Sequence, residues 1–373
     1  MALTGNQHFF LKLLQSGLWE KDVFLEKRTP IDFHEVYQLA EEQSVVGLLT
    51  AGLDHVKDVK VPQYVTLQFV GSSLQQEQRN LAMNVFVAEL IDYLRSRDVY
   101  TLLVKGQGIA QCYERQLWRA CGDVDLLLSD SNYTTAELLL TPLAKRVDEE
   151  YAYNKHIAMN IKDWEVELHG TLRCGLWKSL DCVIDEVQNE VFHDGLVRSW
   201  LNGKTQVFLP RADEDVVFVF THILKHFFKE GVGLRQICDW CRLLWTYRES
   251  LNHGLLKSRI IKAGVMSEWK AFAALAVDAL GMPKEAMPFY SSDKKWKKKA
   301  DQILSFILET GNMGHSRDWS YFGKYPYVMR KAISLWRHTC DGIMYFRIFP
   351  LDALKVWNSM VASGISFALR GKY

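Results

Sequence analysis

Two aspartates stand one residue apart in the apolar run from Gly122 to Leu128. Because side chains alternate across a β-strand, Asp123 and Asp125 are expected on one face of a strand. Neighbouring carboxylates repel each other, so a buried pair needs a proton on one of them or a cation between them. Oxygen ligands favour Mg²⁺ or Mn²⁺ over zinc, and Mg²⁺ often completes its coordination with substrate phosphates. The pair therefore indicates phosphate chemistry; an edge strand with two solvated aspartates is the alternative.

The residues before this pair predict a phosphate-binding turn. The stretch TLLVKG, from Thr101 to Gly106, has the pattern of a short strand, and the residues after it have the pattern of a helix. A strand that enters a helix through glycine exposes backbone N–H groups and the positive end of the helix to an anion. Lys105 adds a full positive charge at the same place.

The residues after the pair predict a third carboxylate close by. The stretch IAMNIKDWEVELHG alternates polar and apolar residues in two short runs around Lys162 and Asp163, which is the pattern of a β-hairpin. In the second run Glu165, Glu167 and His169 share one face, opposite the apolar residues between them. The hairpin would therefore present further acidic groups on one face of the sheet.

This order of motifs resembles the DNA polymerase β-like nucleotidyltransferase superfamily, and within it a group of bacterial uncharacterised nucleotidyltransferases. The order is strand, glycine turn, helix, a strand with D-x-D, helix, and a hairpin with an acid. The motif block covers about the middle third of the chain. The matching residues are Lys105, Gly106, Ala110, Tyr113, Arg119, the run Gly122 to Leu127, and Glu167, Leu168 and His169.

The resemblance implies a two-metal nucleotidyl transfer. Asp123 and Asp125 would hold the Mg²⁺ or Mn²⁺ ion that bridges a nucleoside triphosphate, and Glu167 would complete a second site near the acceptor hydroxyl. A nucleoside monophosphate would then pass to a hydroxyl group. The expected nucleotide contacts come from the cofactor-binding set Lys105, Gly106, Gln107, Arg119 and His169. For Arg119 a surface or purely structural role is the alternative.

Two residues depart from the superfamily pattern. Gln107 follows Gly106 where serine or glycine is usual, so no serine hydroxyl is available for phosphate there. Glu167 stands where aspartate is commoner, although glutamate can ligate the same metal with a longer arm. Two alternatives therefore stay open beside the enzyme: a catalytically inactive nucleotide-binding or interaction protein, and a toxin–antitoxin component.

Length and composition predict an ordinary globular protein of the α+β class. The 373 residues exceed the usual size of one core, with 48% hydrophobic and 24% charged residues. We expect a small mixed sheet with helices at 86–210, between a helical region at 1–85 and a helical domain at 211–373. The absence of a signal pattern, of a long apolar run and of regular cysteine spacing predicts a cytoplasmic protein with reduced thiols and no membrane partner.

Two helices are predicted between Phe208 and Trp245, joined at residues 231–233. His222 and His226 share a face of the first, and Arg235 and Asp239 have the same spacing in the second. Either this polar stripe faces the active cleft and contacts nucleotide or acceptor, or the histidines and the aspartate pair to satisfy buried polar groups.

Three further patterns in the C-terminal half have weaker implications. Cys238 and Cys241 have C-x-x-C spacing, but no second pair completes four ligands, so we expect no structural zinc. The glycine-rich loop at 311–315 is followed by Arg317, which either reaches a phosphate or belongs to a plain turn. The basic run Lys294 to Lys299 is expected on a solvated helix face, because a net charge of +1 argues against a long nucleic-acid footprint. A protein or small-molecule acceptor is therefore expected rather than nucleic acid.

Overall fold

The computed structural model describes residues 3–25, 31–151, 153, 155–193, 196–312 and 324–369, with only the backbone for part of 327–369. Within these ranges, five strands form a mixed sheet in the order β1-β2-β5-β4-β3. The strands are β1 (Leu102–Val104), β2 (Asp123–Leu127), β3 (Ala144–Val147), β4 (His156–Ile161) and β5 (Trp164–His169). Strand β2 is antiparallel to β1 and parallel to β5, and β4 and β5 form the predicted hairpin. Because β2 lies inside the sheet, the edge-strand alternative for its aspartates is wrong.

The two faces of this sheet differ in chemistry, as strand alternation predicts. Val124, Leu126, Val166 and Leu168 are buried in one hydrophobic cluster, the sheet core, with side chains of α4 (Gln63–Arg95) and α6 (Asp130–Leu140). Asp125 and Glu167 are paired in register on the opposite face. The helices therefore cover the apolar face, and the carboxylates point the other way.

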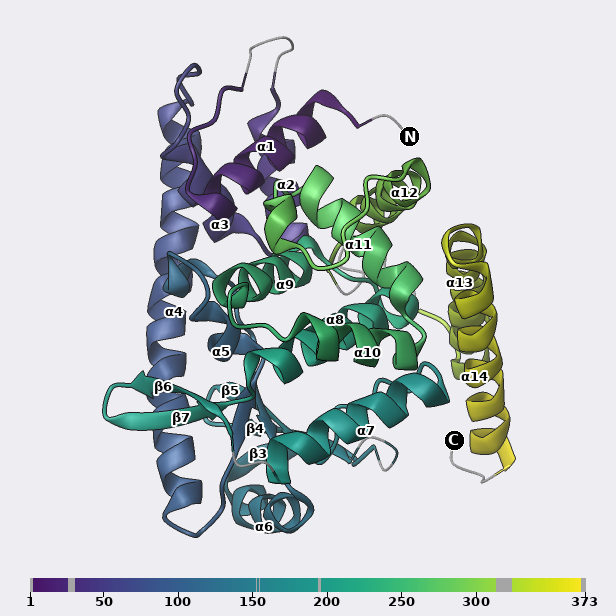
Figure 1. The fold of residues 1–373 in the computed structure, drawn as a ribbon. Helices are drawn as coiled ribbons and strands as arrows, with labels where there is room; N and C mark the ends of the chain where they lie inside the picture. Colours follow the sequence, from purple (N-terminus) through teal and green to yellow (C-terminus); the bar gives the residue numbers. More distant parts are fainter. Residues whose placement is uncertain are drawn as a thin grey trace.

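Helix α4 spans the height of the molecule beside the sheet (Figure 1). Its first half places Val65 and Phe69 in a second hydrophobic cluster, the helical core, whereas Phe86 and Leu90 in its second half belong to the sheet core. It begins at Gln63 and ends at Arg95, so it crosses the predicted limit between the helical region at 1–85 and the core.

The N-terminal and C-terminal helices share the helical core. Helices α1 (Gly5–Trp19), α2 (Phe33–Glu42) and α3 (Val46–Leu53) contribute to it together with α8 (Ala212–Lys229), α9 (Leu234–Tyr247), α10 (His253–Ala263), α11 (Met266–Asp278) and α12 (Lys294–Thr310). Trp19 on α1 donates its indole N–H to the carbonyl of Leu280, 2.6 Å away. The predicted boundary after residue 85 falls inside α4, while the one after residue 210 falls just before α8. These boundaries stay predictions.

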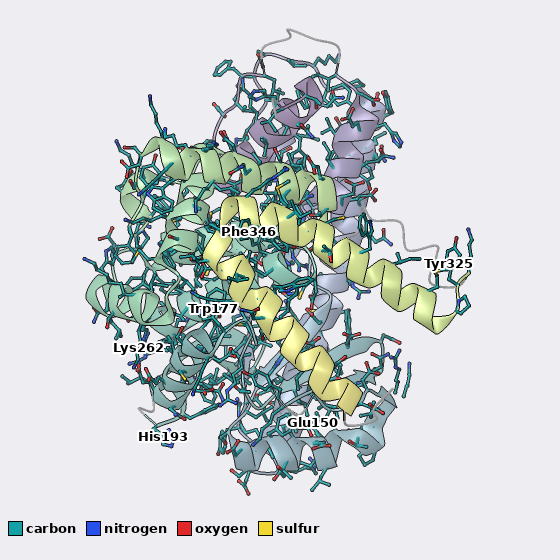
Figure 2. All side chains as sticks on the ribbon, turned by 90° about the vertical axis from the view of Figure 1, so that its right-hand side faces the viewer. Glu150, Trp177, His193, Lys262, Tyr325 and Phe346 are labelled. Atoms are coloured by element: carbon teal, nitrogen blue, oxygen red, sulfur yellow. The ribbon has the colours of Figure 1, made fainter. Side chains whose placement is uncertain are left out.

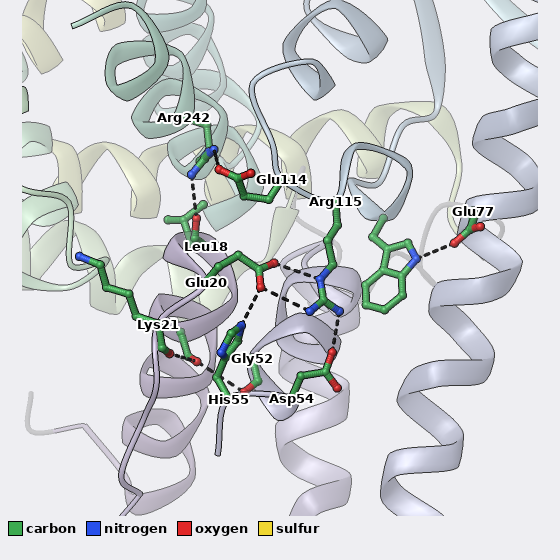
Figure 3. Close-up of polar contacts among 12 residues, drawn as sticks. Leu18, Glu20, Lys21, Gly52, Asp54, His55, Glu77, Glu114, Arg115 and Arg242 are labelled. Carbon is green, nitrogen blue, oxygen red and sulfur yellow. Dashed lines mark hydrogen bonds and ion pairs between the residues drawn. The ribbon is translucent and has the colours of Figure 1, made fainter. Parts of the chain in front are cut away.

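The connection between β1 and β2 is long and is held against the helices. It contains α5 (Gly106–Ala110), much shorter than expected, and the 3-10 turn η1 (Gln116–Trp118). Arg115 forms ion pairs with Glu20 at the end of α1 and with Asp54 after α3, as Figure 3 shows. From α9, Arg242 reaches Glu114 and the carbonyl of Leu18. These contacts fasten the segment that leads into Asp123 to the N-terminal helices and to α9.

The remaining elements surround this arrangement. They are η2 (Thr141–Leu143), α7 (Lys178–His193), the hairpin of β6 (Arg198–Asn202) and β7 (Thr205–Leu209), η3 (Lys284–Ala286), α13 (Tyr327–Ile348) and α14 (Pro350–Leu369). Helices α13 and α14 form a hairpin on one side of the body, and Phe346 lies on it (Figure 2). Arg317 and most of the loop at 311–315 lie outside the described residues. Among those described, no helix is long and apolar enough to cross a membrane.

Candidate active site

Three carboxylates meet on the open face of the sheet. Asp125 on β2 is paired in register with Glu167 on β5, and Asp123 precedes Asp125 by one alternation. Ligand oxygens of Asp123, Asp125 and Glu167 all lie within 4.8 Å of one another. An oxygen-only set of this kind suits a hard divalent cation. The acidic cluster is thus able to hold a metal ion.

Lys105 and His169 balance part of this negative charge. Lys105 Nζ lies 2.7 Å from Asp125 Oδ1, and His169 Nε2 lies 2.8 Å from the same oxygen. Lys105 has a φ of 57° and Gly106 a φ of 37°, so the chain leaves β1 in a left-handed turn that glycine adopts readily. A Cβ added at Gly106 would lie 3.2 Å from Cys121 Sγ, which leaves little room for a side chain.

The electrostatics of the cluster follow from this balance. Repulsion by Asp125, together with burial, raises the pKa of Asp123. Burial alone would raise the pKa of Glu167, but His156, His169 and Lys105 outweigh it and hold that pKa below its usual value. Burial opposes the charge on Lys105, but the attraction of Asp125, Glu167 and Asp123 prevails and raises the pKa of Lys105. The cluster is therefore negative with one buried ammonium group beside it.

The carboxylates line a cavity of about 450 Å³ between the sheet and helices α8 and α9. The wall formed by the helices is basic on balance: Lys225 and Lys229 of α8 and Arg235 of α9 supply cations. The two acids of this wall are each paired, Glu230 with His226 and Asp239 with Arg119. Arg235 donates from Nη1 to the carbonyl of Ala120, and its buried Nε has no hydrogen-bond partner. Carboxylates on one wall and basic groups on the other suit a ligand that combines phosphates with a metal ion.

Comparison with known protein families agrees with this chemistry. A family model described as "Uncharacterised nucleotidyltransferase" matches residues 29–281. The chain belongs to this nucleotidyltransferase family. The match extends from the N-terminal helices through the sheet to α11, so it includes both walls of the cavity. Comparison with curated proteins gave no match, and comparison with solved structures gave none.

Most of the predicted site residues of this nucleotidyltransferase meet at one cavity. Asp123, Asp125, Glu167, Lys105, Gly106, Arg119 and His169 all line it. The Gln107 side chain does not: it is buried, and it donates from Nε2 to Asn80 Oδ1 on α4, 2.9 Å away. The nucleotide-binding roles of these residues stay predictions, and for Gln107 only the backbone remains a candidate.

Arg119 has a clear structural partner. Its Nε and Nη2 donate to both carboxylate oxygens of Asp239 on α9, at 3.0 and 2.6 Å, and Tyr113 donates to Asp239 Oδ1 at 2.7 Å. All three side chains are buried. The bidentate pair fixes the chain just before Asp123 against α9. Arg119 Nη1 is buried and has no partner.

The polar stripe on α8 faces the cavity, as one of its two interpretations proposed. His222 and His226 both line it, and their Nε2 atoms lie 2.9 Å apart. Burial and the positive charge of Lys105 lower the pKa of His222 well below its usual value. Asp239 pairs with Arg119 and not with these histidines, so the predicted pairing of histidine with aspartate does not form. Contact of the stripe with nucleotide or acceptor stays a prediction.

Sequence reasoning did not single out His156. Its Nε2 lies 3.1 Å from Glu167 Oε2, and its ring stacks on that of His169 with 4.8 Å between centroids. His156 and His169 are directly opposite each other in the β4–β5 pair. Counting outward from the hairpin turn at Lys162 and Asp163 would have revealed this pairing, because a two-residue turn fixes the register.

Proposed function

We propose that this protein transfers a nucleoside monophosphate from a nucleoside triphosphate to a hydroxyl group, with Mg²⁺ or Mn²⁺ bound at Asp123, Asp125 and Glu167. The observation that carries the proposal is the convergence of these carboxylates in a cavity whose opposite wall is basic. Membership of the nucleotidyltransferase family supports it. A polymerase β-like core and a bacterial source remain part of this proposal.

In the proposed reaction the acceptor oxygen forms a bond to the α-phosphorus, the bond to the leaving pyrophosphate breaks, and the hydroxyl proton is released. A divalent ion would supply Lewis-acid stabilisation of the charge that develops on the phosphate oxygens. Lys225 and Arg235 bind the triphosphate from the opposite wall, and Lys105 moves from Asp125 to a phosphate. Arg119 holds the strand that carries Asp123 in position through Asp239.

The acceptor in this proposal is a small molecule or a protein. A cavity of about 450 Å³ matches the size range of small-molecule sites, which is about 300–1,000 Å³. The net charge of +1 weighs against a long nucleic-acid track, because such a track needs an excess of Lys and Arg on one surface.

The test is incubation of the protein with each of the four nucleoside triphosphates, labelled at the α-phosphate or at the γ-phosphate, with Mg²⁺ or Mn²⁺ and a cell extract. Transfer of the α-label without the γ-label is expected, with Asp123→Asn lowering the rate by roughly three orders of magnitude. Transfer of the γ-label would show phosphoryl transfer instead. Binding of Mg²⁺ with nucleotide but no transfer of either label would favour the inactive nucleotide-binding alternative.

A further inference from the structure

A second group of possible metal ligands lies beside the acidic cluster and differs from it in chemistry. It consists of His156, Glu167 and His169, whose ligand atoms lie within 4.8 Å of one another. It shares Glu167 with the acidic cluster and replaces two carboxylates by two imidazoles. Imidazole nitrogen is a poor ligand for Mg²⁺ and a good one for borderline ions such as Zn²⁺ and Co²⁺.

The spacing of the donor atoms fits a bound ion. His156 Nε2 lies 3.1 Å from Glu167 Oε2, and His169 Nε2 lies 3.2 Å from the same oxygen. Ligands bound at about 2.0–2.1 Å to a tetrahedral zinc ion lie about 3.3 Å from each other. Each imidazole nitrogen therefore lies at a distance from the carboxylate oxygen that neighbouring ligands of one metal can have, and the two nitrogens lie within 4.8 Å of each other.

The hydrogen bonding of the two histidines leaves a position for such an ion. His156 Nε2 is shielded from solvent, and its contact with Glu167 Oε2 at 3.1 Å lacks the geometry of a regular hydrogen bond. His169 Nε2 lies 2.8 Å from Asp125 Oδ1 and 3.2 Å from Glu167 Oε2, so one nitrogen is shared between two carboxylates. A buried polar atom without a partner is uncommon, and an ion is one of its ordinary explanations.

The backbone supports this geometry rigidly. His156 begins β4 and His169 ends β5, and the two residues are directly opposite in an antiparallel pair. Glu167 is one alternation away on β5, on the same face. Ligands on adjacent strands are more precisely placed than ligands on loops. The cavity reaches all three side chains, so a metal bound there would keep an open position toward it.

We propose that His156, His169 and Glu167 form a binding site for a borderline divalent transition-metal ion such as Zn²⁺ or Co²⁺, next to the oxygen-only site of Asp123 and Asp125. Glu167 connects the two sites. The inference concerns metal binding alone and does not require transfer activity. If the proposed function holds, the two ions of the site are of different kinds.

Cobalt(II) provides a direct probe because its visible absorption reports its ligands. The full chain, first treated with a chelator, is titrated with Co²⁺ without nucleotide, and Zn²⁺ is then added as a competitor. We expect one Co²⁺ per chain with visible bands of a site containing nitrogen ligands, loss of these bands on addition of Zn²⁺, and a rise in melting temperature with either ion.

Two variants and two controls decide the result. His156→Gln and His169→Gln are each expected to weaken Co²⁺ binding by roughly 100-fold or more, because removing a direct ligand should cost at least as much as removing a second-shell partner. Asp123→Asn, which changes only the acidic cluster, and His193→Gln, on the exposed end of α7, should bind Co²⁺ as the parent does.

Three outcomes would overturn the proposal: no Co²⁺ binding by the parent, unchanged binding in both histidine variants, or loss of binding in Asp123→Asn alone. Metal-free melting curves of the variants show whether each is folded before titration. Mg²⁺ with nucleotide is tested separately, so failure of this site and failure of the proposed function give different results.

Discussion

A metal ion bound at Asp125 would compete with the ammonium group of Lys105. This ammonium group lies 2.7 Å from Asp125, with only 20% of the Lys105 side chain exposed. It offsets part of the negative charge of the acidic cluster when no ion is bound, and the proposed reaction requires it to turn toward phosphate. In the proposed function the same residue would stabilise the metal-free protein and also take part in ligand binding.

The first prediction follows from this double role. Lys105→Met should destabilise the metal-free protein by about 1–3 kcal/mol, because it leaves a buried carboxylate with one cationic partner fewer. Denaturant unfolding measures this loss. Millimolar Mg²⁺ should restore more stability to the variant than it adds to the parent. The control is Lys162→Met, which breaks an exposed pair with Glu89 and should cost well under about 1 kcal/mol.

A second prediction is that substitutions of the two aspartates have different effects on the melting temperature. Without metal, Asp123→Asn should leave the melting temperature unchanged or raise it, since it removes a charge that Asp125 repels. Asp125→Asn should lower the melting temperature, since Lys105 and His169 lose their shared partner. In both variants the joint stabilisation by Mg²⁺ and nucleotide should vanish. A joint stabilisation equal to that of the parent would remove these residues from the metal site.

At the residue scale, the sequence predicted which carboxylates form the site better than it predicted which basic residues reach the cavity. Asp123, Asp125 and Glu167 lie within strands, where alternation assigns a face from local sequence alone. Lys225 and Arg235 reach the cavity only because α8 and α9 pack over the sheet, and that packing cannot be derived from the periodicity of either helix. Gln107 was expected near phosphate, yet its side chain points to Asn80, because α4 offers a buried partner there.

At the scale of elements, the connection from β1 to β2 sets the position of Asp123. Its last turn is joined to α9 by the buried Arg119–Asp239 pair and to the N-terminal helices by the more exposed Arg115 pairs. The first of these connections is shielded from water, so it should carry most of the stability.

A third prediction compares the two connections. Asp239→Ala should lower the free energy of unfolding by about 3–5 kcal/mol, because Arg119 is then left buried without its counter-charge. Asp54→Ala breaks an ion pair whose aspartate is 60% exposed and should cost well under about 1 kcal/mol. Urea unfolding of both variants gives the comparison. Equal losses would show that the Arg119 pair does not anchor the strand.

The sequence predicts helices and a hairpin in these segments, but it does not predict the residues at which the elements begin and end. For residues 1–85 only a helical region was predicted, and the structure places two helices, α2 and α3, between Phe33 and Leu53, with a break at Ser44, whose φ is 56°. Nothing in the local pattern marks that break. The β6–β7 hairpin was not predicted, since its strand pattern is short and it forms its own two-stranded sheet.

At the scale of the whole molecule, one hydrophobic core contains residues from both ends of the chain. The burial of cysteines by the folded chain predicts which thiols react. Cys112, Cys121, Cys174, Cys238 and Cys241 are buried, and Cys182 and Cys340 are exposed. Burial raises the pKa of Cys112 to about 11, so little thiolate forms at pH 8. Ellman's reagent should therefore titrate two thiols rapidly, and the others only after denaturation.

Mass spectrometry of the labelled protein identifies the two reactive thiols as a check. Rapid labelling of Cys238 or Cys241 in the native protein would contradict the packing of α9. The same preparation can be analysed for zinc, because the expectation that this C-x-x-C pair holds no structural zinc remains a prediction. About one zinc per chain that persists in a His156→Gln variant would point to the cysteines.

The last prediction concerns the class of acceptor and uses the basic run on α12. Lys294, Lys297 and Lys298 are exposed, whereas Trp296 is buried and Lys299 Nζ lies 4.5 Å from the Phe349 ring centroid. The run is therefore a solvated face only in part, and a fair test changes these three lysines and spares Lys299 and the also exposed Lys295, whose Nζ lies 4.6 Å from the Trp296 ring centroid. Joint replacement of Lys294, Lys297 and Lys298 by glutamine should leave transfer almost unchanged if the acceptor is a small molecule or a protein, because none of them lines the cavity.

Lys225→Gln, on the basic wall of the cavity, should weaken nucleotide binding in the same assay. RNA or DNA binding that falls steeply with salt in the parent and is lost in the triple variant would instead identify a nucleic-acid acceptor.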